Sequence, residues 1–400
     1  MMSRAAIASL VAGLLAAGAA HAQPRTLPEA LATAYATNPT LQTSRAQLRA
    51  TDEGVPAALA GWRPQIVGTV NAGRGPFGQS EQSTPGVPPT YSSLVRNIYA
   101  LQGTVTQPIY TGGKVSATLH KAKNQVFATR AQLLATEETI LFDTVQAYVN
   151  VVLDEQILQI DINNEQILTK QLQSTNDRFR VGELTRTDVA QAEAALASAT
   201  AQRETAEGNL QAARATYEQF VGQPARNLSA PQPLQLPVKT LEAAKVLAAR
   251  NNPNVVSALF NDAAARDAFD VAYSALMPNI NVQFSAFRSE NQVFPGLFES
   301  GGQILGNLSI PIYQGGSEYS GIRQARQQEI AARKQLEDQR RTAVQQATSA
   351  WEQLVAARAS IASNRSAVRA NEIAVEGLER EALVGTRTTL DVLIGIQQLL

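Results

Sequence analysis

Residues 181–189 read "VGELTRTDV", and residues 384–392 read "VGTRTTLDV". Each stretch lies within a long segment that is rich in Ala, Gln, Leu, Glu and Arg and contains no Pro, which is typical of helix. A Gly after one helix and an Asp at the start of the next are common end signals. The sequence therefore predicts two long antiparallel helix pairs, each with one of these stretches at its tip.

The similarity between the two halves of the chain extends beyond these tips. "QPIYTGG" at 107–113 matches "IPIYQGG" at 310–316, with the same spacing of 203 residues that separates the tips. Recurrence at a fixed spacing is the signature of repeated structural units. We predict a first repeat over residues 23–222 and a second over 241–400, joined by a Pro-rich linker at 223–240.

Each repeat is expected to contain a first helical segment, two strands and two long helices. The predicted bounds are strands at about 64–74 and 97–109 and helices at 114–181 and 187–220 in the first repeat, and strands at about 278–288 and 302–312, a helix at 316–383 and a last helix from 388 in the second. A helix over 114–181 would be about 100 Å long at ~1.5 Å per residue. Alignment of the repeats suggests that the last helix is truncated, since the chain stops at residue 400.

The predicted strands alternate between apolar and uncharged polar side chains. In "NINVQFSAF" at 279–287, Ile280, Val282 and Phe284 alternate with Asn, Gln and Ser. Strands of about ten residues with this pattern are typical of outer-membrane barrels, although a soluble sheet packed on a core is an alternative. Four strands are too few to close such a barrel, and an open sheet edge in lipid leaves backbone groups unsatisfied. If the strands lie in lipid, other copies of the chain must supply the missing ones.

The composition and the N-terminus exclude several classes of protein. The 400 residues have no net charge, no Cys and only two His, which argues against a nucleic-acid surface, disulfides, a zinc site or a His-based catalytic triad. Arg4 precedes a short apolar run that ends in Ala20-His21-Ala22, so residues 1–22 are expected to be a signal peptide. "TGGKVS" at 111–116 lacks the spacing of a phosphate-binding loop, and we expect neither a cofactor nor enzyme activity.

The signal peptide, the duplicated "PIY-x-GG" junctions and the paired tips together resemble the TolC family of outer-membrane channel tunnels. The resemblance implies an α+β membrane protein in which long helical hairpins form a periplasmic α-barrel. It also implies four β-strands per chain in a homotrimeric, twelve-stranded outer-membrane β-barrel. Such a protein would be a passive exit duct in a tripartite efflux or type I secretion system of a Gram-negative bacterium. Its partners would be a periplasmic adaptor, an inner-membrane ABC, RND or MFS transporter and outer-membrane lipid, with no nucleic acid.

The resemblance also suggests roles for individual residues near the tips. The tip residues expected to contact the adaptor or the pump are Val181, Gly182, Leu184, Thr185, Val384, Gly385 and Thr386. By position, Asp188 and Arg387 match a charged pair that holds the periplasmic entrance shut, and Gln171 and Glu379 match a hydrogen-bonded pair. Asp391 matches one member of an acidic constriction ring.

Two residues near the tips differ from the family pattern, and both the assigned residues and the whole chain have an alternative interpretation. Ile394 stands where the ring has a second acidic residue, and Ala382 stands where a Tyr shares the charged pair, so a weaker closed state is expected. Asp188 and Asp391 could instead only cap helices, and Arg387 could be a solvated residue. For the whole chain, the alternative from another class is a soluble periplasmic coiled-coil adaptor or scaffold, which would explain the helical hairpins but not the alternating strands.

Overall fold

The computed structural model describes residues 25–81, 90–232, 237–292 and 296–399, so the predicted signal peptide at 1–22 lies outside the described residues. The chain forms two compact units. The first consists of the described parts of Met1–Ser44, Leu134–Ala244 and Gln346–Leu400, and the second of Arg45–Leu133 and Lys245–Gln345.

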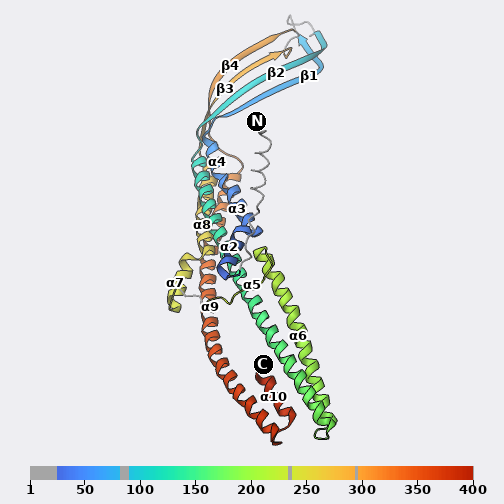
Figure 1. The fold of residues 1–400 in the computed structure, drawn as a ribbon. Helices are drawn as coiled ribbons and strands as arrows, with labels where there is room; N and C mark the ends of the chain where they lie inside the picture. Colours follow the sequence, from blue (N-terminus) through green and yellow to red (C-terminus); the bar gives the residue numbers. More distant parts are fainter. Residues whose placement is uncertain (1–24, 82–89, 233–236, 293–295, 400) are drawn as a thin grey trace, which may run out of the picture. The chain divides into compact units, whose positions relative to one another are not determined.

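The order of elements along the chain is helical segment, two strands and long helices, twice over (Figure 1). The first half contains α2 (Leu27–Thr37), α3 (Pro39–Asp52), α4 (Gly54–Leu59), η1 (Ala60–Trp62), β1 (Gln65–Glu81), β2 (Thr90–Tyr110), α5 (Lys114–Arg180) and α6 (Arg186–Val221). The second half contains α7 (Leu241–Asn251), α8 (Pro253–Tyr273), η2 (Ser274–Leu276), β3 (Asn279–Glu290), β4 (Phe298–Ser309), α9 (Ser317–Leu383) and α10 (Thr389–Leu399).

The second unit contains one antiparallel sheet with the strand order β1-β2-β3-β4 (Figure 1). β1 pairs with β2 from Gln65↔Thr106 to Glu81↔Thr90, and β3 pairs with β4 from Asn279↔Ser309 to Glu290↔Phe298. The central β2–β3 pairing has an irregularity between Pro108 and Tyr110, where Pro cannot donate a ladder hydrogen bond. β1 and β4 are therefore the two edge strands of this sheet.

The strand bounds differ from those that the sequence predicts. β1 continues to Glu81 rather than stopping near 74, although residues 75–78 include two Gly and one Pro. The continuous pairing with β2 overrides these unfavourable local propensities, and Pro76 is tolerated because alternate N–H groups of an edge strand face away from its neighbour. β4 begins at Phe298 and ends at Ser309, rather than spanning 302–312.

The register gathers apolar side chains on one face of the sheet, which we call the apolar face. Ile66 is opposite Val105, Val105 is opposite Phe284, and Phe284 is opposite Ile304. Within the described residues this face is left uncovered, since Ile66 is 77 % and Ile304 is 72 % exposed. The other face contains the amide and hydroxyl side chains, so the period-two pattern of the sequence is realised as two chemically different surfaces.

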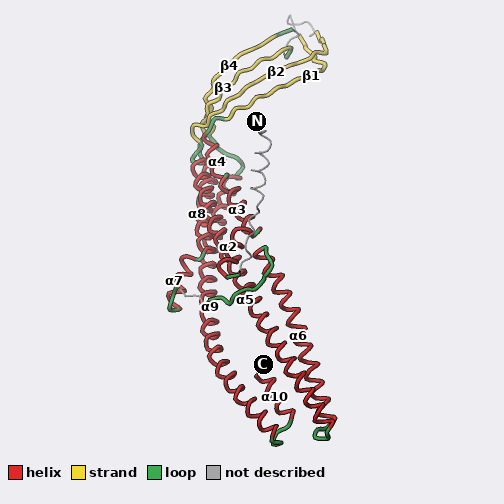
Figure 2. The backbone as a smooth tube through the Cα atoms, in the orientation of Figure 1, coloured by secondary structure: helices red, strands yellow, loops and turns green. Residues whose placement is uncertain are grey.

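In the first unit, α5 and α6 form an antiparallel hairpin (Figure 2). Ala192, Ala199 and Ala206 of α6 recur every seven residues and are each at most 5 % exposed. Ala199 packs with Leu168 of α5, and Leu393 of α10 joins the same cluster. Small side chains at heptad positions allow the two helix backbones to approach closely.

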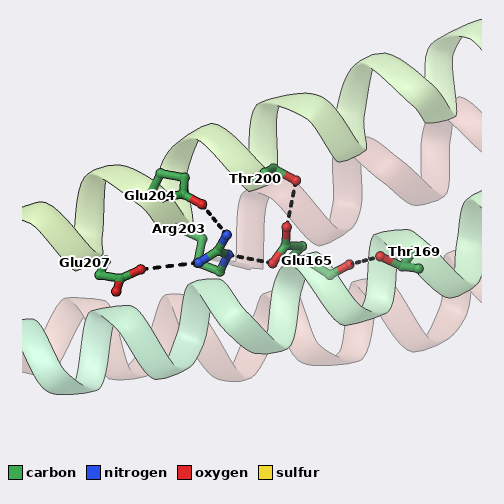
Figure 3. Close-up of polar contacts among 6 residues, drawn as sticks. All are labelled: Glu165, Thr169, Thr200, Arg203, Glu204 and Glu207. Carbon is green, nitrogen blue, oxygen red and sulfur yellow. Dashed lines mark hydrogen bonds and ion pairs between the residues drawn. The ribbon is translucent and has the colours of Figure 1, made fainter.

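Polar contacts fix the register of this hairpin (Figure 3). Glu165 of α5 accepts a 2.7 Å hydrogen bond from Thr200 Oγ1, and its other carboxylate oxygen lies 2.8 Å from Arg203 Nε. Arg203 also contacts Glu204 and Glu207 on its own helix. Because the Glu165 and Arg203 side chains are each only 25 % exposed, their ion pair is less screened than a fully exposed one. A shift of the helices along each other would break it.

Two fully buried tyrosines lie at the other end of the hairpin, where α2 joins the core. The rings of Tyr148 and Tyr217 have centroids 6.2 Å apart. The Tyr148 hydroxyl lies 2.9 Å from the Arg25 carbonyl oxygen and 2.7 Å from that of Ser229. The buried Tyr217 hydroxyl has no hydrogen-bond partner among the residues that the structure places, and burial raises its pKa to about 12.

This contrast predicts different stability effects for the same chemical change. Tyr148→Phe should destabilise the chain by about 1–2 kcal/mol, because it removes a buried hydrogen bond and leaves a carbonyl without its donor. Tyr217→Phe is the matched control and should change the free energy of unfolding by less than ~0.5 kcal/mol, since its hydroxyl makes no such bond. Urea unfolding of the detergent-solubilised variants at equal protein concentration measures both. Equal effects of the two changes would contradict this assignment.

Candidate functional site

The first tip, residues 181–189, is a compact reversal between α5 and α6. Gly182 has φ 86°, in the left-handed region that favours glycine. Its N–H donates to the Phe179 carbonyl, and the Glu183 N–H donates to the Arg178 carbonyl, both at 3.0 Å. These bonds satisfy the last carbonyls of α5, which explains why the helix can stop abruptly at this glycine.

α6 begins with a reciprocal cap between Thr185 and Asp188. The Thr185 N–H and hydroxyl donate to Asp188 Oδ2 at 2.8 Å and 2.7 Å. The Asp188 N–H in turn approaches Thr185 Oγ1 at 3.3 Å. Such a capping box satisfies donors that the first turn of a helix leaves free.

The second tip, residues 384–392, repeats this arrangement bond for bond. Gly385 has φ 82°, and the Thr386 N–H donates to the Glu381 carbonyl at 3.0 Å. The Thr388 N–H and hydroxyl donate to Asp391 Oδ2 at 2.9 Å and 2.8 Å. The similarity of the two stretches in sequence is therefore a similarity in hydrogen bonding.

An ion pair joins the last turn of each long helix to its tip, with opposite polarity. Arg178 Nε lies 3.1 Å from Glu183 Oε2 in the first tip. In the second, Arg387 Nε lies 3.1 Å from Glu381 Oε2. All four side chains are at least 44 % exposed, so each pair contributes only ~0–1 kcal/mol. These are contacts that a docking partner can replace at little cost.

The predicted entrance pairs are not joined within one chain. No hydrogen bond or ion pair connects Asp188 with Arg387, or Gln171 with Glu379, among the residues that the structure describes. Glu379 is exposed, and Gln171 is half-buried with its carbonyl accepting from Thr175 Oγ1. Their assignment to the closed entrance remains a prediction that concerns neighbouring subunits.

The residues predicted to dock partners lie at the solvent-accessible ends of the two tips. Val181 is 72 % and Val384 is 75 % exposed, while Leu184 is half-buried. The two valines occupy equivalent places in the two tips, since Val384 lies 203 residues after Val181. Their role in docking also remains a prediction.

Sequence reasoning named the two aspartates as caps but missed the residues that complete the motif. Thr388, the pair Arg178–Glu183 and Glu381, the partner of Arg387, were not predicted. A signal existed in the sequence, because Thr-x-x-Asp recurs at 185–188 and 388–391 directly after the two reversals.

The described residues also limit other kinds of site. They contain no group of three or more His, Cys, Asp or Glu arranged to hold a metal ion. Among the described residues, no helix is both long enough and apolar enough to cross a membrane.

Comparison with known proteins covers nearly the whole chain. The family model "Outer membrane efflux protein" matches residues 30–223 and 246–399. The outer membrane efflux protein BepC of Brucella suis is 34 % identical over 97 % of this chain and 82 % of its own length. The outer membrane protein TolC of Escherichia coli is 25 % identical over 64 % of this chain and 55 % of its own length.

Solved channel structures share the fold. The outer-membrane channel OprN superposes with a TM-score of 0.79 at 19 % identity, covering 93 % of this chain and 84 % of that structure. At this identity the likeness concerns the fold alone: long helices and a four-stranded sheet per chain.

The caps predict how acid affects the tips. Hydrogen bonds from the Thr185 hydroxyl and N–H hold the pKa of Asp188 below its ordinary 3.8. Those from the Thr388 N–H and hydroxyl do the same for the pKa of Asp391. A lowered folded-state pKa means that the charged caps stabilise the fold fully above pH 3.8 and cease to do so as the pH falls through the lowered values.

We therefore expect the wild type to lose more stability between pH 6 and pH 3 than the double variant Asp188→Asn/Asp391→Asn. Asn can still accept a capping bond but does not titrate in this range. The measurement is the free energy of unfolding at the two pH values. A variant that loses as much as the wild type would show that the two carboxylates do not contribute.

Proposed function

Because the chain belongs to the outer membrane efflux protein family and is located in the outer membrane of a Gram-negative bacterium, we propose that it is the passive exit duct of a tripartite export system. The resemblance to the TolC family that the tips and junctions suggested is thereby confirmed. Membership does not favour the alternative of a soluble adaptor. Family members are channel proteins rather than enzymes, which agrees with the expectation of a non-enzyme.

In the proposal three copies of the chain form a twelve-stranded barrel, four strands from each. The observation that supports this most directly is the sheet itself, which has one exposed apolar face and two edge strands, β1 and β4. In hydrocarbon each unpaired backbone group costs several kcal/mol, so β1 of one copy must pair with β4 of the next. A dry core against the apolar face would make this unnecessary, but the part of the chain that the structure describes supplies none.

The long helix α5 supports the same assembly. Val126 and Ile140, on one heptad seam, are buried within the chain. On the adjacent seam, Phe127 and Leu134 are 42 % and 48 % exposed, although the Phe127 ring lies 5.1 Å from that of Phe260 and the seam becomes buried at Tyr148. A helix with two apolar seams can contact a neighbour on each side, so the exposed part of this seam, at Leu134, is available to another subunit of an α-helical tunnel.

The tips would form the periplasmic entrance of this tunnel. In the proposal, links between neighbouring subunits, including Asp188 with Arg387 and Gln171 with Glu379, hold the entrance shut, and three Asp391 carboxylates form a constriction ring. A periplasmic adaptor and an inner-membrane transporter dock at the tips and open it. The substrate would be chosen by the transporter, in an efflux or a type I secretion system.

The experiment that tests this function is a combined measurement of mass and conductance. The chain should stay with outer membranes on fractionation, have the mass of three copies after detergent extraction, and conduct ions in a planar bilayer. A monomer that is released without detergent would overturn the proposal.

The constriction ring gives a sharper prediction. Asp391→Asn should weaken the block of single-channel current by divalent cations several-fold, because three like charges around one axis attract cations strongly. Asp188→Asn removes a carboxylate with the same cap geometry and is the matched control. It should alter the open probability rather than the block. If Asp391→Asn leaves both conductance and block unchanged, the ring assignment is wrong.

A further inference from the structure

A small hollow with charged side chains interrupts the apolar face of the sheet. The register places Leu101 opposite Val70 on β1 and opposite Arg288 on β3, and Tyr99 opposite Glu290. All five side chains therefore share the apolar face. Together with Ala100 they line a hollow of about 340 Å³, with aliphatic side chains at one end and charged ones at the other.

The guanidinium of Arg288 has two contacts within the sheet and still has N–H groups that can donate to a ligand. It lies 4.5 Å from the centroid of the Phe298 ring, and its Nη2 lies 3.3 Å from Glu290 Oε1. The side chain is nevertheless 62 % exposed. A guanidinium has five N–H donors, and Glu290 is its one hydrogen-bonding partner among the described residues, which leaves most of these donors free for another acceptor.

Position along the strand places this hollow at the end of the apolar band. Arg288 lies eight residues beyond Ile280 on β3, about 26 Å at ~3.3 Å per residue. The apolar bands of membrane barrels are about 25 Å tall and are flanked by aromatic residues. Tyr99, 51 % exposed, and Phe298, 49 % exposed, are such residues. The hollow lies toward the hairpin ends of the strands, away from the ends that lead into helices, and thus on the outer-leaflet side.

We propose that this hollow binds a lipid of the outer leaflet through an anionic phosphate headgroup on Arg288, with an acyl chain along Leu101 and Val70. The inference rests on the proposed function, since it requires the sheet to cross the membrane. Free N–H donors of a planar guanidinium match phosphate oxygens, and the ring of Phe298 keeps the cation close to the apolar surface. Arg74, exposed and on the same face by its pairing with Asn97, adds a second cation at this end.

The sheet provides a matched control on its opposite face. Arg96 also lies 4.5 Å from the centroid of a phenylalanine ring, that of Phe77. Its partner in the register is Gly75, which places it on the polar face, where it donates to the Gln292 carbonyl. Arg96→Gln therefore removes the same kind of cation–ring contact without touching the apolar face.

The test uses the full chain in neutral detergent, with lipid binding measured by native mass spectrometry. The probes are diphosphorylated lipid A, the same lipid without its phosphates, and inorganic phosphate. The wild type should bind the phosphorylated lipid about tenfold more tightly than the dephosphorylated one, as expected for one charge-assisted site. Arg288→Gln should abolish this preference, Arg288→Lys should keep part of it, and Arg96→Gln should keep all of it.

Equal binding of the two lipids by the wild type would overturn the proposal. So would an equal loss of the preference for phosphorylated lipid in Arg96→Gln and Arg288→Gln. Displacement of the lipid by millimolar inorganic phosphate would also overturn it, because it would indicate a site for free anions. Insertion into bilayers of neutral lipid separates this inference from the function on which it rests. If the wild type does not insert, both are wrong. If it inserts and shows no phosphate preference, only the lipid site is wrong.

Discussion

The unpaired outer edges of β1 and β4 are the constraint on which the rest of the structure depends. These strands are 17 and 12 residues long, and each pairs with a neighbour in the sheet on one side only. Water can satisfy such edges, whereas hydrocarbon cannot, so the edges must be paired if the sheet lies in the membrane as proposed. The proposed pairing between copies satisfies both edges, and it makes the assembly a condition for stability in the membrane rather than a later addition to a finished fold.

The helical part meets a different constraint, because each helix satisfies its backbone groups internally. What must be fixed here is the position of α5 and α6 along each other. The alanines of α6 allow close approach but fix the sliding position poorly, since one small residue resembles the next. The ion pair of Glu165 with Arg203, and that of Arg214 with Glu155 at 2.9 Å, supply what the alanines lack. The hairpin thus combines interchangeable apolar contacts with a few specific polar ones.

The sequence was most informative where a residue type has a physical meaning of its own. Gly182 and Gly385 gave the helix reversals, because few other residues adopt a left-handed backbone without strain. The far end of β1 could not be predicted from Gly75 and Pro76, since only the partner strand makes a strand of them. The antiparallel hairpin around Gly182 brings Glu165 of α5 near Arg203 of α6. Several polar residues lie in this region, and side-chain rotamers decide which of them form an ion pair. No local sequence pattern fixes those rotamers.

Asp188 and Asp391 can each cap a helix and also take part in the proposed closed entrance. A carboxylate has two oxygens and about four acceptor positions. In both tips the threonine N–H and hydroxyl approach the same oxygen, Oδ2, so the cap occupies one side of the group. The same bonds keep the pKa of each carboxyl low, and the remaining oxygen stays charged and available at neutral pH. A helix cap can thus hold a carboxylate rigidly in one orientation while a neighbouring subunit or a passing cation contacts its free side.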